Sequence, residues 1–360
     1  MKTKIVYVLV SSEKDIYLEQ AYVSMYSLKH YNPDAHIVLL TDKRTSLTFE
    51  GVREKEVSLA DEIVTVELSD ALNAQQRSRQ LKTSVRQHVT GDFLFIDCDT
   101  LVVKSLEAID RIKDVKIAAC RDTHALFAEN PYRKMCLEHG KMLDWPIESE
   151  TDYFNSGVVY VKDCPESHEF YRKWNENLNK GYPKKVYMDQ PSFAKTNFEM
   201  GHIVKMLPDV WNCELKHGIR YLKDAFIVHY LCTNSSQFQN KQLFLLNEED
   251  VLLRVKRTGD IPIEVIETIN DPFKGLAEIT HCFAGEDVYF LQTGSYLRLR
   301  RQFHGEIPFF LKAFLKIYDY GYSVLKVGVG RSGGGKIPRD SYFKEPVFVK
   351  LHDCQILNAA

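Results

Sequence analysis

The chain lacks three features that would assign it to a common class of protein. It has no apolar run near the ~20 residues that a membrane-spanning helix needs. It has no excess of positive charge, since 47 Lys and Arg stand against 49 Asp and Glu, so no nucleic-acid partner is expected. Its eight cysteines are scattered, with no Cys-x-x-Cys pair at zinc-ligand spacing. We therefore expect reduced thiols and a cytoplasmic protein.

The first residues imitate a short signal peptide. A basic start, Met1–Lys4, precedes the apolar run Ile5–Val10. That run is short for a signal peptide and no small-residue cleavage site follows it. We therefore interpret it as the first strand of the fold.

Alternating apolar runs and amphipathic segments predict an α/β fold with a mostly parallel central sheet. At 360 residues, the chain can hold one large domain or two ordinary ones. Helices are expected at 17–30 and 75–88. Strands are expected at 4–10, 36–40, 93–96, 115–119, 158–161 and 226–228.

The composition changes at about residue 241, after which helix-like segments carry little strand signal. We therefore predict an α/β domain over 1–240 and a mainly helical extension over 241–360. Within it, residues 297–336 hold eight Lys and Arg, two acids and seven aromatics. Such a segment could bind peripherally to an anionic membrane at its inner face, or its aromatics could pack into the core.

The most informative stretch is an apolar run, Phe93–Ile96, that ends in Asp97-Cys98-Asp99. Open α/β sheets bind ligands at the carboxyl ends of their strands. Residues two apart in an extended chain point the same way, so Asp97 and Asp99 could share one cation that holds a diphosphate. The alternative is a solvated turn.

Three further motifs follow in order: Phe154-Asn155-Ser156-Gly157, Asp189-Gln190, and an apolar strand that ends at His229. With Asp97-Cys98-Asp99, they resemble the family 8 glycosyltransferases, which have the Rossmann-like GT-A fold. The resemblance extends over roughly residues 4–235, a normal domain length. It implies that a hexose moves, with retention of configuration, from a UDP-linked nucleotide sugar to a glycan or lipid-linked acceptor.

The chemistry of such a transfer needs a metal. The leaving diphosphate gains negative charge, which a divalent ion neutralises as a Lewis acid. Asp97, Asp99 and His229 would supply two oxygens and one nitrogen, a set that suits Mn²⁺ better than Mg²⁺. The alternative for His229 is a hydrogen-bonded core histidine.

Arg79 and Lys82 lie about one helical turn apart, on one face of the helix before the Asp97 strand. They could reach phosphate or the donor sugar, and the resemblance favours Arg79 first. The alternative is a solvated basic helix.

Asn155 could bind sugar hydroxyls or the acceptor, and Gly157 would let the backbone approach a ligand. The alternative for both is a turn before strand 158–161. The resemblance implies that Asp189 binds a donor hydroxyl and that Gln190 stabilises the oxocarbenium-like centre. The alternative for this pair is a helix start, and both readings can hold together.

One departure from the family pattern concerns the residues after His229. The family has a Gly and then a Lys-Pro-Trp there, and its lysine contacts phosphate. Here Tyr230-Leu231-Cys232 follows instead, so Asn234, Ser235 or Lys241 could take the lysine's place.

Two other classes of function compete with transfer. Asp97-Cys98-Asp99-Thr100 looks like the haloacid dehalogenase motif, in which Asp97 would attack a phosphate, but the glycine of that motif is absent. The chain could also be a catalytically inactive membrane-surface scaffold.

Overall fold

The computed structural model describes residues 1–147, 150–230 and 244–276, with single positions at 313, 317 and 320. The segment 297–336 and the lysine substitutes Asn234, Ser235 and Lys241 therefore lie outside the described residues, apart from those single positions. Within the described part, no helix is both long and apolar enough to cross a membrane.

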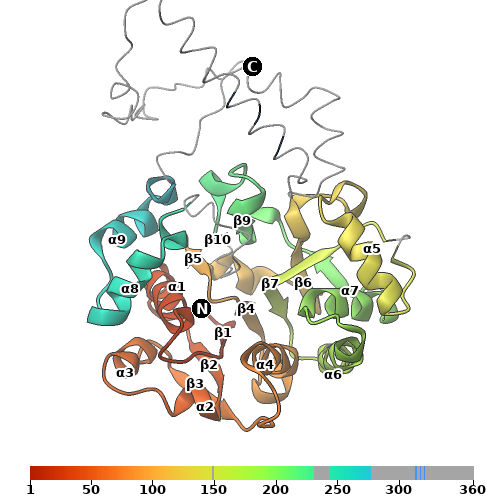
Figure 1. The fold of residues 1–360 in the computed structure, drawn as a ribbon, viewed down its shortest axis with the longest axis horizontal. Helices are drawn as coiled ribbons and strands as arrows, with labels where there is room; N and C mark the ends of the chain where they lie inside the picture. Colours follow the sequence, from red (N-terminus) through yellow and green to blue (C-terminus); the bar gives the residue numbers. More distant parts are fainter. Residues whose placement is uncertain (148–149, 231–243, 277–312, 314–316, 318–319, 321–360) are drawn as a thin grey trace, which may run out of the picture. The chain divides into compact units, whose positions relative to one another are not determined.

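A seven-stranded sheet and a three-stranded sheet form the centre of the described chain (Figure 1). The large sheet has the order β3-β2-β1-β4-β7-β6-β8, and the small sheet has the order β5-β10-β9. The large sheet consists of β1 (Lys4–Leu9), β2 (Ile37–Asp42), β3 (Glu62–Val66), β4 (Phe93–Ile96), β6 (Ile117–Arg121), β7 (Phe154–Val161) and β8 (Val204–Met206). The small sheet consists of β5 (Thr100–Val102), β9 (Cys213–Glu214) and β10 (Ile227–His229).

Nine α-helices accompany these sheets in the described residues. They are α1 (Tyr17–Tyr31), α2 (Lys43–Ser46), α3 (Val52–Val57), α4 (Ala74–His88), α5 (Arg133–Met142), α6 (Pro165–Gly181), α7 (Asp189–Glu199), α8 (Glu249–Thr258) and α9 (Ile263–Asn270). The sheet pairings β1–β2, β1–β4, β2–β3 and β6–β8 are parallel, whereas β7 runs antiparallel to β4 and β6. The predicted α/β class with a mostly parallel central sheet is confirmed.

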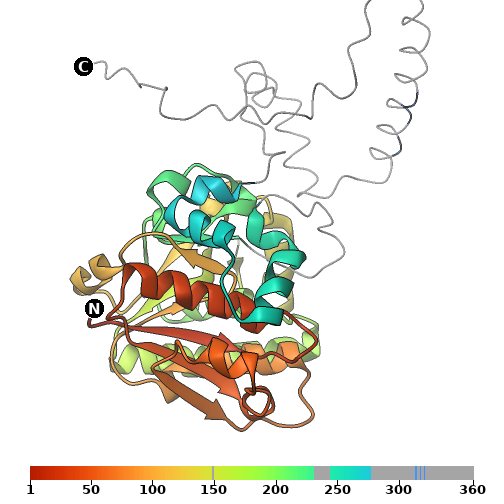
Figure 2. The ribbon, with the colours of Figure 1, turned by 90° about the vertical axis from the view of Figure 1, so that its left-hand side faces the viewer.

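Helices cover both faces of the large sheet, which explains its continuous apolar strands. Side chains alternate along β1, so Ile5, Tyr7 and Leu9 pack into one cluster with α1. Val6 and Val8 face the other cluster, which α4 and α6 complete. Figure 2 shows α1 on one side of the strands and the other two helices on the opposite side.

The helices α8 and α9 belong to the same compact unit as the sheets. Val251, Leu252 and Val265 share a buried cluster with Tyr22 of α1 and with β10. The first compact unit runs over Met1–Thr280. The domain boundary at residue 240 stays a prediction.

Two local details differ from the sequence expectations. Strand β7 begins at Phe154 rather than near 158, because Phe154 pairs with Arg121 of β6. Residues 97–99 form a bend rather than extended chain, because Thr100 leaves the large sheet and pairs with His229 in the small one. The motif Asn155–Gly157 therefore lies inside a strand, and the two aspartates are not aligned by strand periodicity.

Several charged side chains meet in the buried contact between α1, α3 and α8. Glu19 of α1 and Glu56 of α3 are fully buried. Lys256 of α8 lies 3.2 Å from Glu19, and neither oxygen of Glu56 has a hydrogen-bond partner among the described residues. Burial, with the Glu19 carboxylate, raises the pKa of Glu56 to about 8, although Arg53, Lys256 and Lys55 oppose the shift.

Glu56→Gln is expected to stabilise the protein at alkaline pH. The folded state holds a proton on Glu56 that the unfolded state releases near 4.5, so this stability is lost as the pH rises through about 8. The free energy of unfolding should fall by at most about 1.4 kcal/mol per pH unit within that window. Melting curves between pH 5.5 and 9 should show a shallower decline for Glu56→Gln than for wild type or for the exposed control Glu54→Gln. Parallel declines for all three would contradict the assignment.

Candidate metal centre

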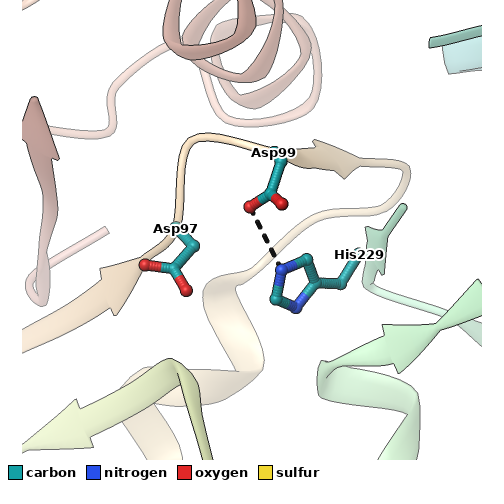
Figure 3. Close-up of side chains that lie close together, drawn as sticks. All are labelled: Asp97, Asp99 and His229. Atoms are coloured by element: carbon teal, nitrogen blue, oxygen red, sulfur yellow. Dashed lines mark hydrogen bonds and ion pairs between the residues drawn. The ribbon is translucent and has the colours of Figure 1, made fainter. Parts of the chain in front are cut away.

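Three side chains from separate segments converge at the junction of the two sheets. Asp97 follows β4, Asp99 precedes β5, and His229 ends β10. One ligand atom from each lies within 4.8 Å of the others, and Figure 3 shows the three side chains facing one another. His229 Nε2 lies 3.1 Å from Asp99 Oδ1 although 130 positions separate the two residues. The antiparallel register of β5 with β10 places them together, because it pairs His229 with Thr100.

The orientation of the His229 ring is fixed by a chain of amides behind it. Asn212 Nδ2 donates to Asn155 Oδ1 at 3.1 Å, which leaves Asn212 Oδ1 facing His229 Nδ1 at 3.0 Å. Asn155 Oδ1 also accepts from the Gly157 amide at 2.7 Å. This amide chain assigns the proton of the neutral ring to Nδ1 and leaves the Nε2 lone pair pointing at the Asp99 carboxylate.

This arrangement fits a divalent cation. A neutral Nε2 and a carboxylate oxygen are both acceptors, so a proton or a metal ion must lie between them. The ring is buried, which lowers its pKa, but Asp99 and Asp97 raise the pKa of His229 above its ordinary value. An outer partner that fixes the second ring nitrogen, here Asn212, is typical of metal-bound histidines.

Gly157 lets the side chains of His229 and Asp97 pack closely against the backbone of β7. A Cβ at this position would lie 2.6 Å from His229 Cε1 and 2.9 Å from Asp97 Oδ2. The carboxylates of Asp97 and Asp99 are half-buried, whereas His229 is fully enclosed. The site therefore has a rigid imidazole at its base and two carboxylates that a ligand can reach.

Two cations from α4 lie against the carboxylates. Lys82 Nζ is 3.0 Å from Asp97 Oδ1 and 3.1 Å from Asp189 Oδ2, and Arg79 Nε is 3.0 Å from Asp189 Oδ1. Burial raises the pKa of Asp189, but Arg79 and Lys82 reverse this and hold it well below its ordinary value. With Asp99 included, three carboxylates lie together with Arg79, Lys82 and the His229 ring. When His229 is neutral, three carboxylates face two cations, and this balance favours a bound metal ion.

The two aspartates of the motif differ in their electrostatic surroundings. Burial raises the pKa of Asp97 despite the opposing Lys82 ammonium, and the neighbouring Asp99 adds to the rise. Burial also raises the pKa of Asp99, but in the absence of a metal the protonated His229 ring holds the pKa of Asp99 below its ordinary value. Asp99 is thus the carboxylate more readily kept ionised.

Asp122 joins the site although the sequence analysis did not select it. It is buried, accepts from Asn130 Nδ2 at 2.8 Å and from Asn155 Nδ2 at 3.5 Å, and also bonds the Gln190 side chain. The signal was present, because Asp122 follows an apolar strand just as Asp97 does. The next residue, Thr123, has a φ of +59°, which is a strained conformation for a β-branched side chain.

The candidate residues that the structure describes lie in this one region, linked by the contacts above. Asp189 begins α7, and its Oδ2 accepts from Ser156 Oγ at 2.8 Å. Asp189 therefore serves as both the first residue of a helix and a member of the charged cluster. Ser156 is a further member that the sequence analysis did not select.

Comparison of the structure with solved structures finds glycosyltransferases. Mouse xyloside xylosyltransferase 1 is 13% identical, with 64% of this chain and 98% of the other covered and a TM-score of 0.45. The galactosyltransferase LgtC, solved with donor and acceptor sugar analogs, is 14% identical, with 74% and 99% covered and a TM-score of 0.47. The glycosyltransferase GlyE of Streptococcus pneumoniae is 16% identical, with 78% and 67% covered and a TM-score of 0.46.

No protein-family model matches the sequence, and no curated protein matches it either.

Proposed function

We propose that the protein is a metal-dependent glycosyltransferase that moves a hexose from a UDP-linked nucleotide sugar to a glycan or lipid-linked acceptor. The observation that carries the proposal is the convergence of Asp97, Asp99 and His229 within 4.8 Å, beside the Lys82 and Arg79 cations of α4. Carboxylates and one imidazole suit Mn²⁺, with Mg²⁺ as the alternative ion.

Each residue of the cluster has a role in binding the donor. Asp97, Asp99 and His229 Nε2 would hold the metal, which when bound supplies Lewis-acid neutralisation of a diphosphate. Lys82 and Arg79 add fixed positive charge near the same phosphates. Gly157 lets His229 and Asp97 lie close to the backbone of β7, where any side chain would collide with both.

Sugar recognition belongs to the neighbouring polar residues. Asp189 is kept ionised by Arg79 and Lys82, so it can accept from a donor hydroxyl. Asn155 and Gln190 are tied together through Asp122, which holds both side chains in fixed orientations. We assign Asn155 to sugar or acceptor hydroxyls and Gln190 to the oxocarbenium-like centre of a retaining transfer.

The acceptor and its location rest on the sequence alone. A lipid-linked acceptor at the inner face of a membrane would suit the basic and aromatic segment 297–336. That segment lies outside the described residues except at 313, 317 and 320, so the contact stays a prediction.

Thermal shift with nucleotides tests the proposal. UDP or a UDP-sugar with Mn²⁺ is expected to raise the melting temperature, whereas UDP in EDTA is not. A ligand present at 100 times its Kd stabilises by about 2.7 kcal/mol, which is readily detected. No shift with any nucleotide sugar, or an equal shift in EDTA, would contradict the metal-dependent reading. Hydrolysis of p-nitrophenyl phosphate without a nucleotide requirement would favour the phosphatase reading of Asp97.

A further inference from the structure

A line of three buried hydroxyl groups runs from β1 through α1 to the metal-binding bend. Tyr7 OH lies 3.0 Å from Ser24 Oγ, and Ser24 Oγ lies 2.8 Å from Thr100 Oγ1. Thr100 Oγ1 then donates to the Asp97 carbonyl oxygen at 2.8 Å. All three side chains are fully buried, so water does not compete for these hydrogen bonds.

The direction of each hydrogen bond follows from counting protons. Each hydroxyl carries one hydrogen, and Thr100 commits its hydrogen to the Asp97 carbonyl. Thr100 must therefore accept from Ser24, and Ser24 must accept from Tyr7. All three hydrogen bonds therefore run in one donor-to-acceptor direction, from the Tyr7 hydroxyl to the backbone carbonyl of Asp97.

Two backbone hydrogen bonds also hold this bend, one at Asp97 and one at Asp99. The Asp97 amide donates to the Gly157 carbonyl at 2.8 Å, and the Tyr230 amide donates to the Asp99 carbonyl at 3.2 Å. The Asp97 carbonyl is held by Thr100, at the point where the chain leaves the large sheet. Freeing this carbonyl would let the Asp97 peptide rotate, which would move its carboxylate relative to Asp99 and His229.

We propose that Thr100, Ser24 and Tyr7 are positioning residues that set the geometry of the metal ligands through the Asp97 carbonyl. The inference rests on the proposed function, because it assumes that Asp97 and Asp99 hold a metal. The three hydroxyls do not touch the metal and act only through the backbone. Their effect falls with distance from Asp97, so Thr100 matters most and Tyr7 least.

Thr100→Val tests the inference, because valine keeps the branched shape and removes only the hydroxyl. Mn²⁺ affinity of the folded protein, measured from free Mn²⁺ by electron paramagnetic resonance, is expected to fall about 10-fold, the lower end for outer-shell partners. The matched control is Thr268→Val in α9, a fully buried threonine whose hydroxyl also donates to a carbonyl, that of Glu264 at 2.8 Å. Both variants should melt earlier than wild type, but the control should bind Mn²⁺ normally.

Ser24→Ala and Tyr7→Phe provide independent variants if Thr100→Val fails to fold. Each should weaken Mn²⁺ binding by less than Thr100→Val does, and Tyr7→Phe should have the smallest effect. Wild-type Mn²⁺ affinity in all variants that fold would overturn the positioning role while leaving the proposed function intact. Absence of Mn²⁺ binding by the wild type would instead overturn the metal site, and this role with it.

Discussion

Asp99→Asn is expected to lower sugar transfer by about 10²- to 10³-fold, because charge stabilisation of several kcal/mol at the leaving group is lost. The substitution keeps the shape of the side chain and removes its charge. The new amide nitrogen can donate to His229 Nε2, which lies 3.1 Å from Asp99 Oδ1 in the wild type. That hydrogen bond satisfies the ring without a metal, so the fold should persist while Mn²⁺-dependent UDP binding is lost.

The control for this result is Asp224→Asn, which removes an equal charge from an exposed side chain just before β10. Transfer from a panel of UDP-sugars, the Mn²⁺ dependence of UDP binding and the melting temperature should be measured for both variants. Asp224→Asn should match the wild type in all three. Full transfer by Asp99→Asn, or undiminished wild-type transfer in excess EDTA, would remove the metal from the mechanism.

The strands and helices of the sheet core were largely predictable, because they are long and strongly patterned. The run Phe93–Ile96 is a strand, and Asp97 and Asp99 follow its carboxyl end as expected. The helix that carries Arg79 and Lys82 was also expected, and it spans Ala74–His88. Apolar periodicity is a local property, so it can be recognised in the sequence without knowledge of the tertiary fold.

The reason given for pairing Asp97 with Asp99 was wrong, although the two aspartates do meet. Strand periodicity would align residues two apart, but 97–99 form a bend. The short strands β5 and β10 create this bend by pairing with each other, and they have only three residues each, too few to show a period. Their pairing depends on contacts between residues more than a hundred positions apart, which a single sequence does not reveal.

The polar residues around the ligands were harder to predict than the ligands themselves. Asn212 lies in an irregular segment before β9, and its role appears only because its amide bridges Asn155 and His229. Asp122 carried the same strand-end signal as Asp97 but lacked a second aspartate to mark it. Outer partners have no fixed spacing in the chain, because they depend on tertiary packing.

Gly157→Ala is expected to lower both Mn²⁺ affinity and transfer, with transfer falling about 10²-fold for a displacement near 1 Å. The added Cβ would lie 2.6 Å from His229 Cε1 and 2.9 Å from both Asp97 Oδ2 and Asn155 Oδ1. Gly157 lies inside β7, outside the left-handed region, so the effect comes from crowding rather than from backbone strain. His229 cannot yield easily, because Asn212 and Asp99 hold both of its ring nitrogens.

The matched control for this variant is Gly140→Ala in α5, where a Cβ would lie 2.4 Å from Ile147 Cγ2. Both variants crowd a buried site and should lower the melting temperature. Only Gly157→Ala crowds two of the proposed metal ligands, so only it should weaken Mn²⁺ binding when both proteins are assayed well below their melting temperatures. Equal Mn²⁺ affinities in the two variants would show that the space beside His229 serves packing alone. Loss of Mn²⁺ affinity in Gly157→Ala alone would show that the metal site requires glycine at position 157. The three ligands would still be present in that variant, and only the distances between them would have changed.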